Sequence, residues 1–333
     1  MNRTNTFLAA LTLAVVALGI LAGSPLAQTG QGVYEACEPH RGAIDAAVLP
    51  DVVDEDLCPV AGRAIVDHGV GTLVPAPGES VFAEAISPRG NQHLVVSNPP
   101  GDRLLLEEVG TEDEAHESGS MESGSLATRA GGPSACRDPR YNSWDSRLNH
   151  YIRWYFNMRT TPSGKSKFAV LRAMKRAGRN VSRVQDGCGI ADRVPAVLKY
   201  VGTTTQSVNM GTNGICGAND HKSVVGFGDL PNYLTGNTCV WSWIQDGPNR
   251  INSSDVRLNK EDFHWTAEVT RSCRGRHDVE STMTHERGHT FGLGDVSEAH
   301  HPNLTMSSGS NGPCQTSERS LGKGDAIGLN RKY

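Results

Sequence analysis

The stretch THERGHTFGLGDV, residues 284–296, decides how the rest of this sequence is interpreted. It places His285 and His289 four residues apart in a segment whose apolar spacing predicts a helix. Side chains at this spacing project from one helix face, so the two imidazoles are expected side by side. Gly292 follows, and glycine readily adopts the left-handed conformation that ends helices. The pattern therefore predicts a helix that carries two histidines on one face and ends in a sharp turn.

Two imidazoles on one helix face can bind a single metal ion, and nearby acidic residues extend the chemistry. Glu286 lies to the side of the histidine face, where it can accept a proton from a water on the metal without being a ligand. After the turn at Gly292 the chain brings Asp295 back toward His285 and His289, and its carboxylate can complete the ligand set. We therefore predict one catalytic Zn²⁺ held by His285, His289 and Asp295, with Glu286 as the general base.

These residues resemble the signature of the metzincin zinc endopeptidases, HExxHxxGxx followed by His or Asp and then a methionine turn. This sequence fills the signature from His285 to Asp295, and HPNLTMSS supplies Met306 for the methionine beneath the metal. Residues 278–308 are most similar to secreted bacterial matrixin-like proteins, although Asp as third ligand is similar to the snapalysins. The resemblance implies an α+β catalytic domain: a twisted mixed sheet of about five strands, two main helices including the metal-binding helix, and a small C-terminal subdomain. Gly292 and Met306 would be structural residues of its site.

The aspartate leaves other third ligands open. His300 and His301 follow closely, and imidazole is also a good zinc ligand. Glu318 ranks last, because nothing around it matches the thermolysin-like enzymes that take a glutamate from a later helix. Calcium is compatible with the sequence, but no pattern assigns residues to it.

The first residues have the features of an export signal. Arg3 precedes an apolar run from Phe7 to Ala22, and small residues and Gln28 follow. No later stretch reaches the roughly 18 apolar residues that a spanning helix needs. We therefore predict a signal peptide at 1–27 and a secreted, extracellular protein with no membrane partner after its removal.

Eight cysteines follow the predicted signal, and an exported chain meets conditions in which thiols pair. Cys37 and Cys58 lie early and the other six lie from Cys136 onward, so each part is expected to close its own bridges. Sequence does not choose among the connectivities of the six. Matrixins often silence themselves with a cysteine in a PRCGxPD segment, which Cys136-Arg137-Asp138 resembles in altered order. We expect Cys136 in a disulfide instead, because the later count would otherwise be odd.

Charge divides the chain into two unlike parts. Residues 28–125 hold 18 acidic and 4 basic side chains, whereas residues 126–333 hold 18 acidic and 27 basic ones. Residues 110–134 are rich in Gly, Ser and acids and predict a flexible linker. We therefore expect an acidic β-rich propeptide or accessory region at 28–109 and the zinc metalloprotease domain at 135–333.

The acidic region is expected to be a propeptide that inhibits the enzyme intramolecularly, since opposite charges favour docking. A permanent accessory domain is the alternative. The basic part lacks a Lys/Arg block, so we expect no nucleic-acid partner.

Apolar spacing predicts a helix at 168–184, and β-favouring runs predict strands at SVFAEAI, HLVVSN, SVVGFGDL, NTCVWSWI and SSDVRLN. NTCVWSWI, residues 237–244, is the candidate edge strand that aligns a protein or peptide substrate by backbone hydrogen bonds. An ordinary sheet strand is the alternative interpretation.

Together these features predict a secreted zinc-dependent endopeptidase, made as a zymogen. The competing hypothesis is a secreted zinc-containing binding or adhesion protein without proteolytic activity. The two differ in whether the metal keeps an open coordination position for water.

Overall fold

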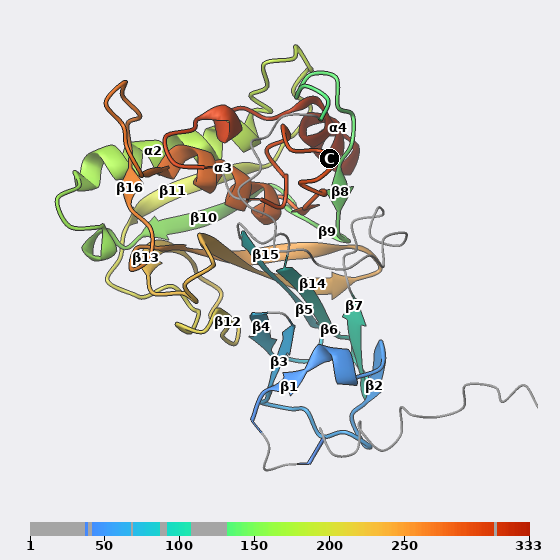
Figure 1. The fold of residues 1–333 in the computed structure, drawn as a ribbon. Helices are drawn as coiled ribbons and strands as arrows, with labels where there is room; N and C mark the ends of the chain where they lie inside the picture. The colour runs from blue at the N-terminus through green and yellow to red at the C-terminus, as the bar shows by residue number, and fades with distance from the viewer. Residues whose placement is uncertain (1–36, 39–41, 68, 87–91, 108–131, 310–311) are drawn as a thin grey trace, which may run out of the picture.

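One large mixed sheet organises the residues that the computed structural model describes, which are 37–38, 42–67, 69–86, 92–107, 132–309 and 312–333 (Figure 1). Its strands, in chain order, are β2 (Val52–Asp54), β5 (Glu79–Ile86), β6 (Gln92–Asn98), β7 (Arg103–Glu107), β9 (Ser146–Arg147), β10 (Tyr151–Phe156), β11 (Val197–Thr203), β13 (Ser223–Gly228), β14 (Gly236–Gln245) and β15 (Gly247–Asn259). In space they follow the order β11-β10-β13-β15-β14-β5-β6-β7-β2, with β9 beside β15. The predicted signal peptide, 1–27, and residues 110–131 of the predicted linker lie outside the described residues.

The later part of the chain, from residue 132 onward, contributes five neighbouring strands, β11, β10, β13, β15 and β14. The first four pair in parallel, and β14 pairs antiparallel with β15. Beyond β14 the sheet continues into β5, β6, β7 and β2, all antiparallel to their neighbours. The acidic region is thus rich in strands, and these strands extend the sheet of the later part.

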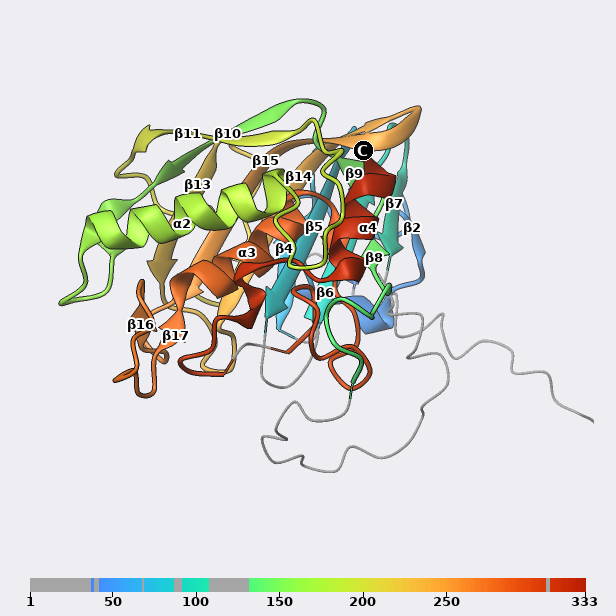
Figure 2. The same ribbon diagram turned by 90° about the horizontal axis from the view of Figure 1, so that it is seen from above.

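Three helices of the described residues, α2 (Lys167–Ser182), α3 (Val279–Thr290) and α4 (Lys323–Lys332), lie on one face of this sheet (Figure 2). The helix predicted from apolar spacing is α2, which buries Val170, Met174 and Val181 on one side. Asp278 caps α3, because its carboxylate accepts the backbone N–H of Ser281 at 2.9 Å. The architecture is therefore mixed α and β, as predicted, with α2 packed against the histidine-bearing helix.

Shorter elements complete the described chain. They are β1 (Ile44–Asp45), β3 (Ala64–Asp67), β4 (Val70–Leu73), β8 (Asn142–Ser143), β12 (Ile215–Cys216), β16 (Trp265–Thr266), β17 (His277–Asp278), β18 (Leu293–Gly294), and the 3₁₀ turns η1 (Ala46–Val48), η3 (Met158–Thr160) and η4 (Ser317–Arg319). A small sheet has the order β1-β3-β4-β12, and the pairs β16-β17 and β18-β8 stand apart from it. Pairing of β4 with β12 gives the acidic region a second contact with the later part.

All eight cysteines form disulfides: Cys37–Cys58, Cys136–Cys188, Cys216–Cys239 and Cys273–Cys314. The first bridge lies within the acidic region and the other three within the later part, which confirms the predicted grouping. Cys136 is confirmed as a disulfide cysteine. Four disulfides suggest an oxidising, extracellular environment. Within the described residues, no helix combines the length and apolar character needed to cross a membrane.

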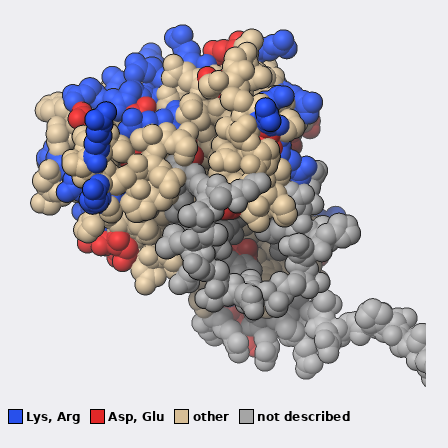
Figure 3. Space-filling model, turned by 45° about the horizontal axis from the view of Figure 1, so that its top comes forward, with Lys and Arg blue, Asp and Glu red and all other residues tan. Residues whose placement is uncertain are grey.

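Basic side chains of the later part gather over α2. This helix carries Lys167, Arg172, Lys175, Arg176 and Arg179. Figure 3 shows Lys and Arg covering the upper left of the molecule, where α2 lies in Figure 1. The contact that joins β5 to the later part is instead a backbone ladder along β14, so it follows a sheet edge rather than this charged surface.

Asp255, buried in the middle of β15, is expected to make the stability of the fold depend on pH. Its carboxylate accepts the backbone N–H groups of Asn209 and Val224, and burial raises its pKa to about 7. In the unfolded chain an aspartate titrates near pH 4, about three units lower. Between these values the folded chain holds the proton more tightly, so this group's contribution to stability falls as pH rises from about 4 to about 7.

We therefore expect Asp255→Asn to remove this component from the pH dependence of the free energy of unfolding. Denaturant unfolding between pH 4.5 and pH 8, roughly the window set by the two pKa values, measures the slope for each protein. Asp246→Asn, in the exposed turn between β14 and β15, is the control and should keep the wild-type slope. Equal slopes for wild type and Asp255→Asn would show that Asp255 does not retain its proton in the folded chain.

Candidate metal centre

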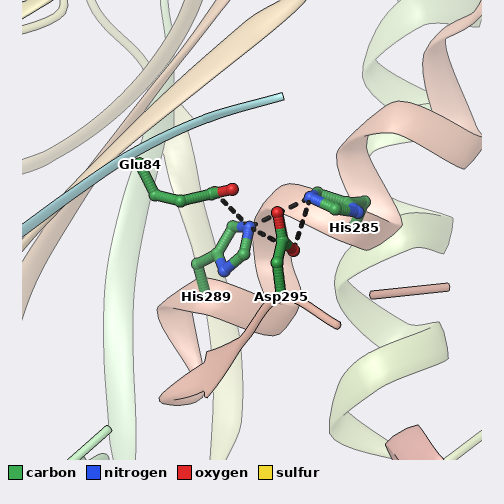
Figure 4. Close-up of side chains that lie close together, drawn as sticks. All are labelled: Glu84, His285, His289 and Asp295. Carbon is green, nitrogen blue, oxygen red and sulfur yellow. Dashed lines mark hydrogen bonds and ion pairs between the residues drawn. The ribbon is translucent and has the colours of Figure 1, made fainter. Parts of the chain in front are cut away.

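Four buried side chains converge below the sheet: Glu84 from β5, His285 and His289 from α3, and Asp295 just after β18 (Figure 4). One ligand atom of each lies within 4.8 Å of the others. The two Nε2 atoms of the histidines are 3.0 Å apart, and Asp295 Oδ1 lies 3.3 Å from His285 Nε2 and 3.6 Å from His289 Nε2. The Glu84 carboxylate contacts His289 Nε2. This group could hold a metal ion.

The spacing of these atoms fits a tetrahedral ion. Ligands about 2.0–2.1 Å from a tetrahedral centre lie about 3.3 Å from one another, close to the distances among His285, His289 and Asp295. Among the described residues, no N–H or hydroxyl group donates a hydrogen bond to the carboxylate oxygens of Glu84 or Asp295. Buried carboxylates without such donors are costly, and a cation among them would remove this cost.

Backbone carbonyls fix the orientation of both imidazoles. His285 Nδ1 lies 2.8 Å from the carbonyl oxygen of Thr305, and His289 Nδ1 lies 3.0 Å from that of Leu293. A ring that donates from Nδ1 presents an unprotonated Nε2, which is the form that binds metal. Both Nε2 atoms therefore face the common centre.

The turn after α3 has the geometry predicted from the sequence. Gly292 has φ of 84°, and a Cβ at this position would collide with the carbonyl oxygen of Ser146. Only glycine fits, for both conformation and space. The turn returns the chain through β18 and places Asp295 beside the two histidines.

Met306 lies against the helix that carries the histidines. It is buried, and a Cβ on Gly288 would collide with its Sδ. Asp325 holds the turn before it by accepting the backbone N–H of Thr305 at 2.8 Å and that of Met306 at 3.3 Å. Burial raises the pKa of Asp325 to about 6. Met306 therefore packs against the helix that carries His285 and His289.

Glu286 is buried on the same helix and points toward β14. Its Oε2 accepts a hydrogen bond from the hydroxyl of Thr238, and Gly236 leaves room for it, because a Cβ there would collide with Oε1. Burial raises the pKa of Glu286 to about 8, and the charge of Asp295 adds to the rise. The raised pKa gives the Glu286 carboxylate a high proton affinity, which favours proton acceptance once the group is ionised.

The charges of the centre favour a bound cation. Burial raises the pKa of Glu84 to about 8, with a further contribution from the charge of Glu286. Burial and the charge of Glu84 raise the pKa of Asp295 well above its usual range, whereas burial lowers that of His289. A divalent cation would stabilise the ionised carboxylates and the neutral imidazoles together.

The structure brings together His285, His289 and Asp295, and it keeps the alternative third ligands out of the group. His300 is exposed and its Nδ1 lies 3.2 Å from Ser297 Oγ. His301 Nδ1 lies 2.8 Å from Asp138. Glu318 is buried in η4 and is not a member of the group.

Glu84 is the member of the group that the sequence interpretation missed. It lies in SVFAEAI, where every residue of the strand is buried. An acidic side chain inside an otherwise apolar run was the available signal, since buried carboxylates are rare unless they are paired or bind a metal. The contact of Glu84 with the histidines depends on the position of β5 beside β14, which the sequence does not give.

A comparison with profiles of known protein families finds none that matches this chain, and a comparison with curated proteins finds no similar sequence. The functional assignment therefore depends on the geometry of the centre.

Proposed function

We propose that the chain is the latent form of a secreted, metzincin-like zinc endopeptidase. The observation that carries this proposal is that β5, an extended segment of polypeptide, lies antiparallel to β14 directly over the candidate metal centre. Proteins that recognise extended peptides often hold them in this way, as an added strand at a sheet edge. This arrangement supports a peptide as the ligand of the site.

His285, His289 and Asp295 would hold the zinc. Two imidazoles and a carboxylate are ligands that zinc accepts in catalytic sites, where three protein side chains leave one position open. Bound zinc would supply a Lewis acid for the peptide carbonyl and would lower the pKa of a water toward neutrality.

Glu286 would act as the proton acceptor. It would take a proton from the attacking water and return it to the leaving amine of the substrate. The Thr238 hydroxyl orients its carboxylate, and Gly236 leaves space for it. The carbonyls of Thr305 and Leu293 keep both imidazoles in the tautomer that faces the centre. β14 would align the substrate backbone.

Three features support the metzincin resemblance. The later part supplies five neighbouring strands, with β14 as its outermost. Helix α3 carries the two histidines and ends in the left-handed glycine at 292. Met306 packs against that helix. The predicted signal peptide and the four disulfides support secretion.

A second function is favoured by one observation. With Glu84 included, the group offers four protein ligands, and closed four-ligand sites are usually structural. A secreted metal-containing binding or adhesion protein would keep this arrangement permanently. The two functions differ in whether Glu84 is ever displaced from the metal centre.

The test is proteolysis by the full chain after it has been cut at a specific protease site introduced within residues 110–131. The zinc-loaded, cut protein is incubated with a mixture of peptides, and the products are identified by mass spectrometry. We expect new internal cuts in the peptides, which disappear with a chelator and return with zinc. A protein that binds zinc and has lost its acidic region, yet cuts no peptide, would favour the binding protein.

A further inference from the structure

We propose that β5 is a displaceable inhibitory strand, and that Glu84 on it closes the metal centre as a fourth ligand. This inference rests on the proposed function and names the regulation of the same site. In this inference the Glu84 carboxylate keeps the uncut chain inactive, whereas in matrixins a cysteine often has this role.

The backbone of β5 occupies most of the outer edge of β14. The pairing runs from Glu79 opposite Trp243 to Ile86 opposite Gly236. Without β5, these N–H and C=O groups of β14 would form the free edge of the later part's sheet, ready to pair with another strand. A peptide substrate and β5 therefore compete for one edge.

The register places Glu84 over the reactive groups. Glu84 lies directly opposite Thr238, the residue whose hydroxyl binds Glu286. Its carboxylate contacts His289 Nε2 and is fully buried. A fourth protein ligand here would fill the position that a catalytic water needs. The strand therefore blocks both the substrate edge and the water site.

Phe82 gives the strand a second anchor on the same side. It precedes Glu84 by two residues, so both side chains point to one face of the sheet. Its ring stacks on Trp144, with centroids 4.6 Å apart and planes at 4°, and lies 5.6 Å from the ring of His289. One carboxylate at the centre and one aromatic ring beside it hold β5 in register.

The covalent structure permits release by a single cut. All eight cysteines are paired, and none of the four disulfides joins the acidic region to the later part. A cut within residues 110–131 would therefore leave two pieces held only by noncovalent contacts. β5 is continuous in the sheet with β6, β7 and β2, so these strands would leave together.

The inference is tested on the full chain, cut within residues 110–131, as wild type, Glu84→Gln and Glu79→Gln. Glu79 lies on the same strand, is also buried and accepts a hydrogen bond from Asn219, so it is a matched control. Retention of the acidic fragment is measured by sedimentation over a dilution series, with zinc or with a chelator. The same three proteins are loaded with Co²⁺, whose visible absorption reports its ligands.

With zinc, we expect Glu84→Gln to weaken retention of the fragment by about tenfold or more, because a ligand bond is lost. Chelation should weaken retention in wild type but hardly change it in Glu84→Gln, since metal and strand are linked through this side chain. The cobalt spectrum should change in Glu84→Gln and not in Glu79→Gln. If Glu84→Gln fails to fold, comparison of wild type with and without metal still tests whether the metal strengthens retention of the acidic fragment.

Equal retention and equal cobalt spectra in wild type and Glu84→Gln would overturn the inference. These readouts need no catalysis, so they separate it from the proposed function. If the protein cleaves peptides and Glu84→Gln has no effect, the inhibitory strand is contradicted but the endopeptidase is not. Metal-linked retention through Glu84 together with no cleavage supports Glu84 as the closing ligand and contradicts the endopeptidase.

Discussion

Replacing Glu286 by Gln should lower the kcat of the released protein on peptides by a factor of about 10²–10⁴, the usual contribution of a general acid–base group. Zinc affinity should stay unchanged, because Glu286 is not a member of the four-residue group. Glutamine keeps the shape and can still meet the Thr238 hydroxyl, but it cannot accept a proton. Turnover kinetics and a zinc titration on the same samples measure the two effects.

Glu280→Gln is the matched control for this experiment. Glu280 is buried on the same helix and pairs with Arg176 at 2.7 Å, on the side facing α2. Its replacement should leave kcat near the wild-type value. If Glu286→Gln retained full activity, the base would have to be another residue and the assignment of Glu286 would be wrong.

Replacing Asp295 by Ala should lower zinc affinity by at least about 100-fold. Losing a direct ligand costs more than losing a residue that merely orients one, which typically costs 10- to 100-fold. Among the described residues, the Asp295 carboxylate lies against the other members of the group, His285 and His289, and no backbone N–H or hydroxyl donates to it, so alanine removes a ligand and breaks no contact outside the metal centre. Competition with a chromophoric chelator measures the affinity of each variant.

His300→Ala and His301→Ala are the controls, because these histidines are the alternative third ligands in the sequence. Their side chains pair with Ser297 and Asp138, so neither replacement should change zinc affinity. If zinc affinity were unchanged in Asp295→Ala and reduced in one of the histidine variants, that histidine would be the third ligand.

Local sequence information was sufficient for the helix that carries the histidines. The Asp278 cap, the four-residue spacing of His285 and His289, and the glycine at 292 act within about four turns of chain. Each depends on conformational preferences of the residues themselves. The histidine face of α3 and the turn that ends it are consequently where the sequence predicts them.

The fourth member of the group could not be predicted in this way. Glu84 reaches the histidines only because β5 pairs with β14, which lies some 150 residues further along the chain. A shift of one residue in this register would turn Glu84 to the other face of the sheet. Such a register is set by packing of both strands, including Phe82 against Trp144, and no local pattern encodes it.

The same limit applies to the role of the acidic region. Its charge suggested docking by attraction, whereas the structure joins it to the later part through paired strands, a shared apolar core, an aromatic anchor and one carboxylate at the centre. Strand pairing between distant segments leaves no trace in composition. The acidic character of the region is therefore separate from the way in which it meets β14.

X-ray absorption at the zinc edge of the uncut full chain is the most direct test of the metal centre. We expect one zinc per chain, bound by two imidazole nitrogens and two carboxylate oxygens at about 2.0–2.1 Å. An ion bound through other ligands, or a chain that takes up no zinc, would contradict the assignment of Glu84, His285, His289 and Asp295.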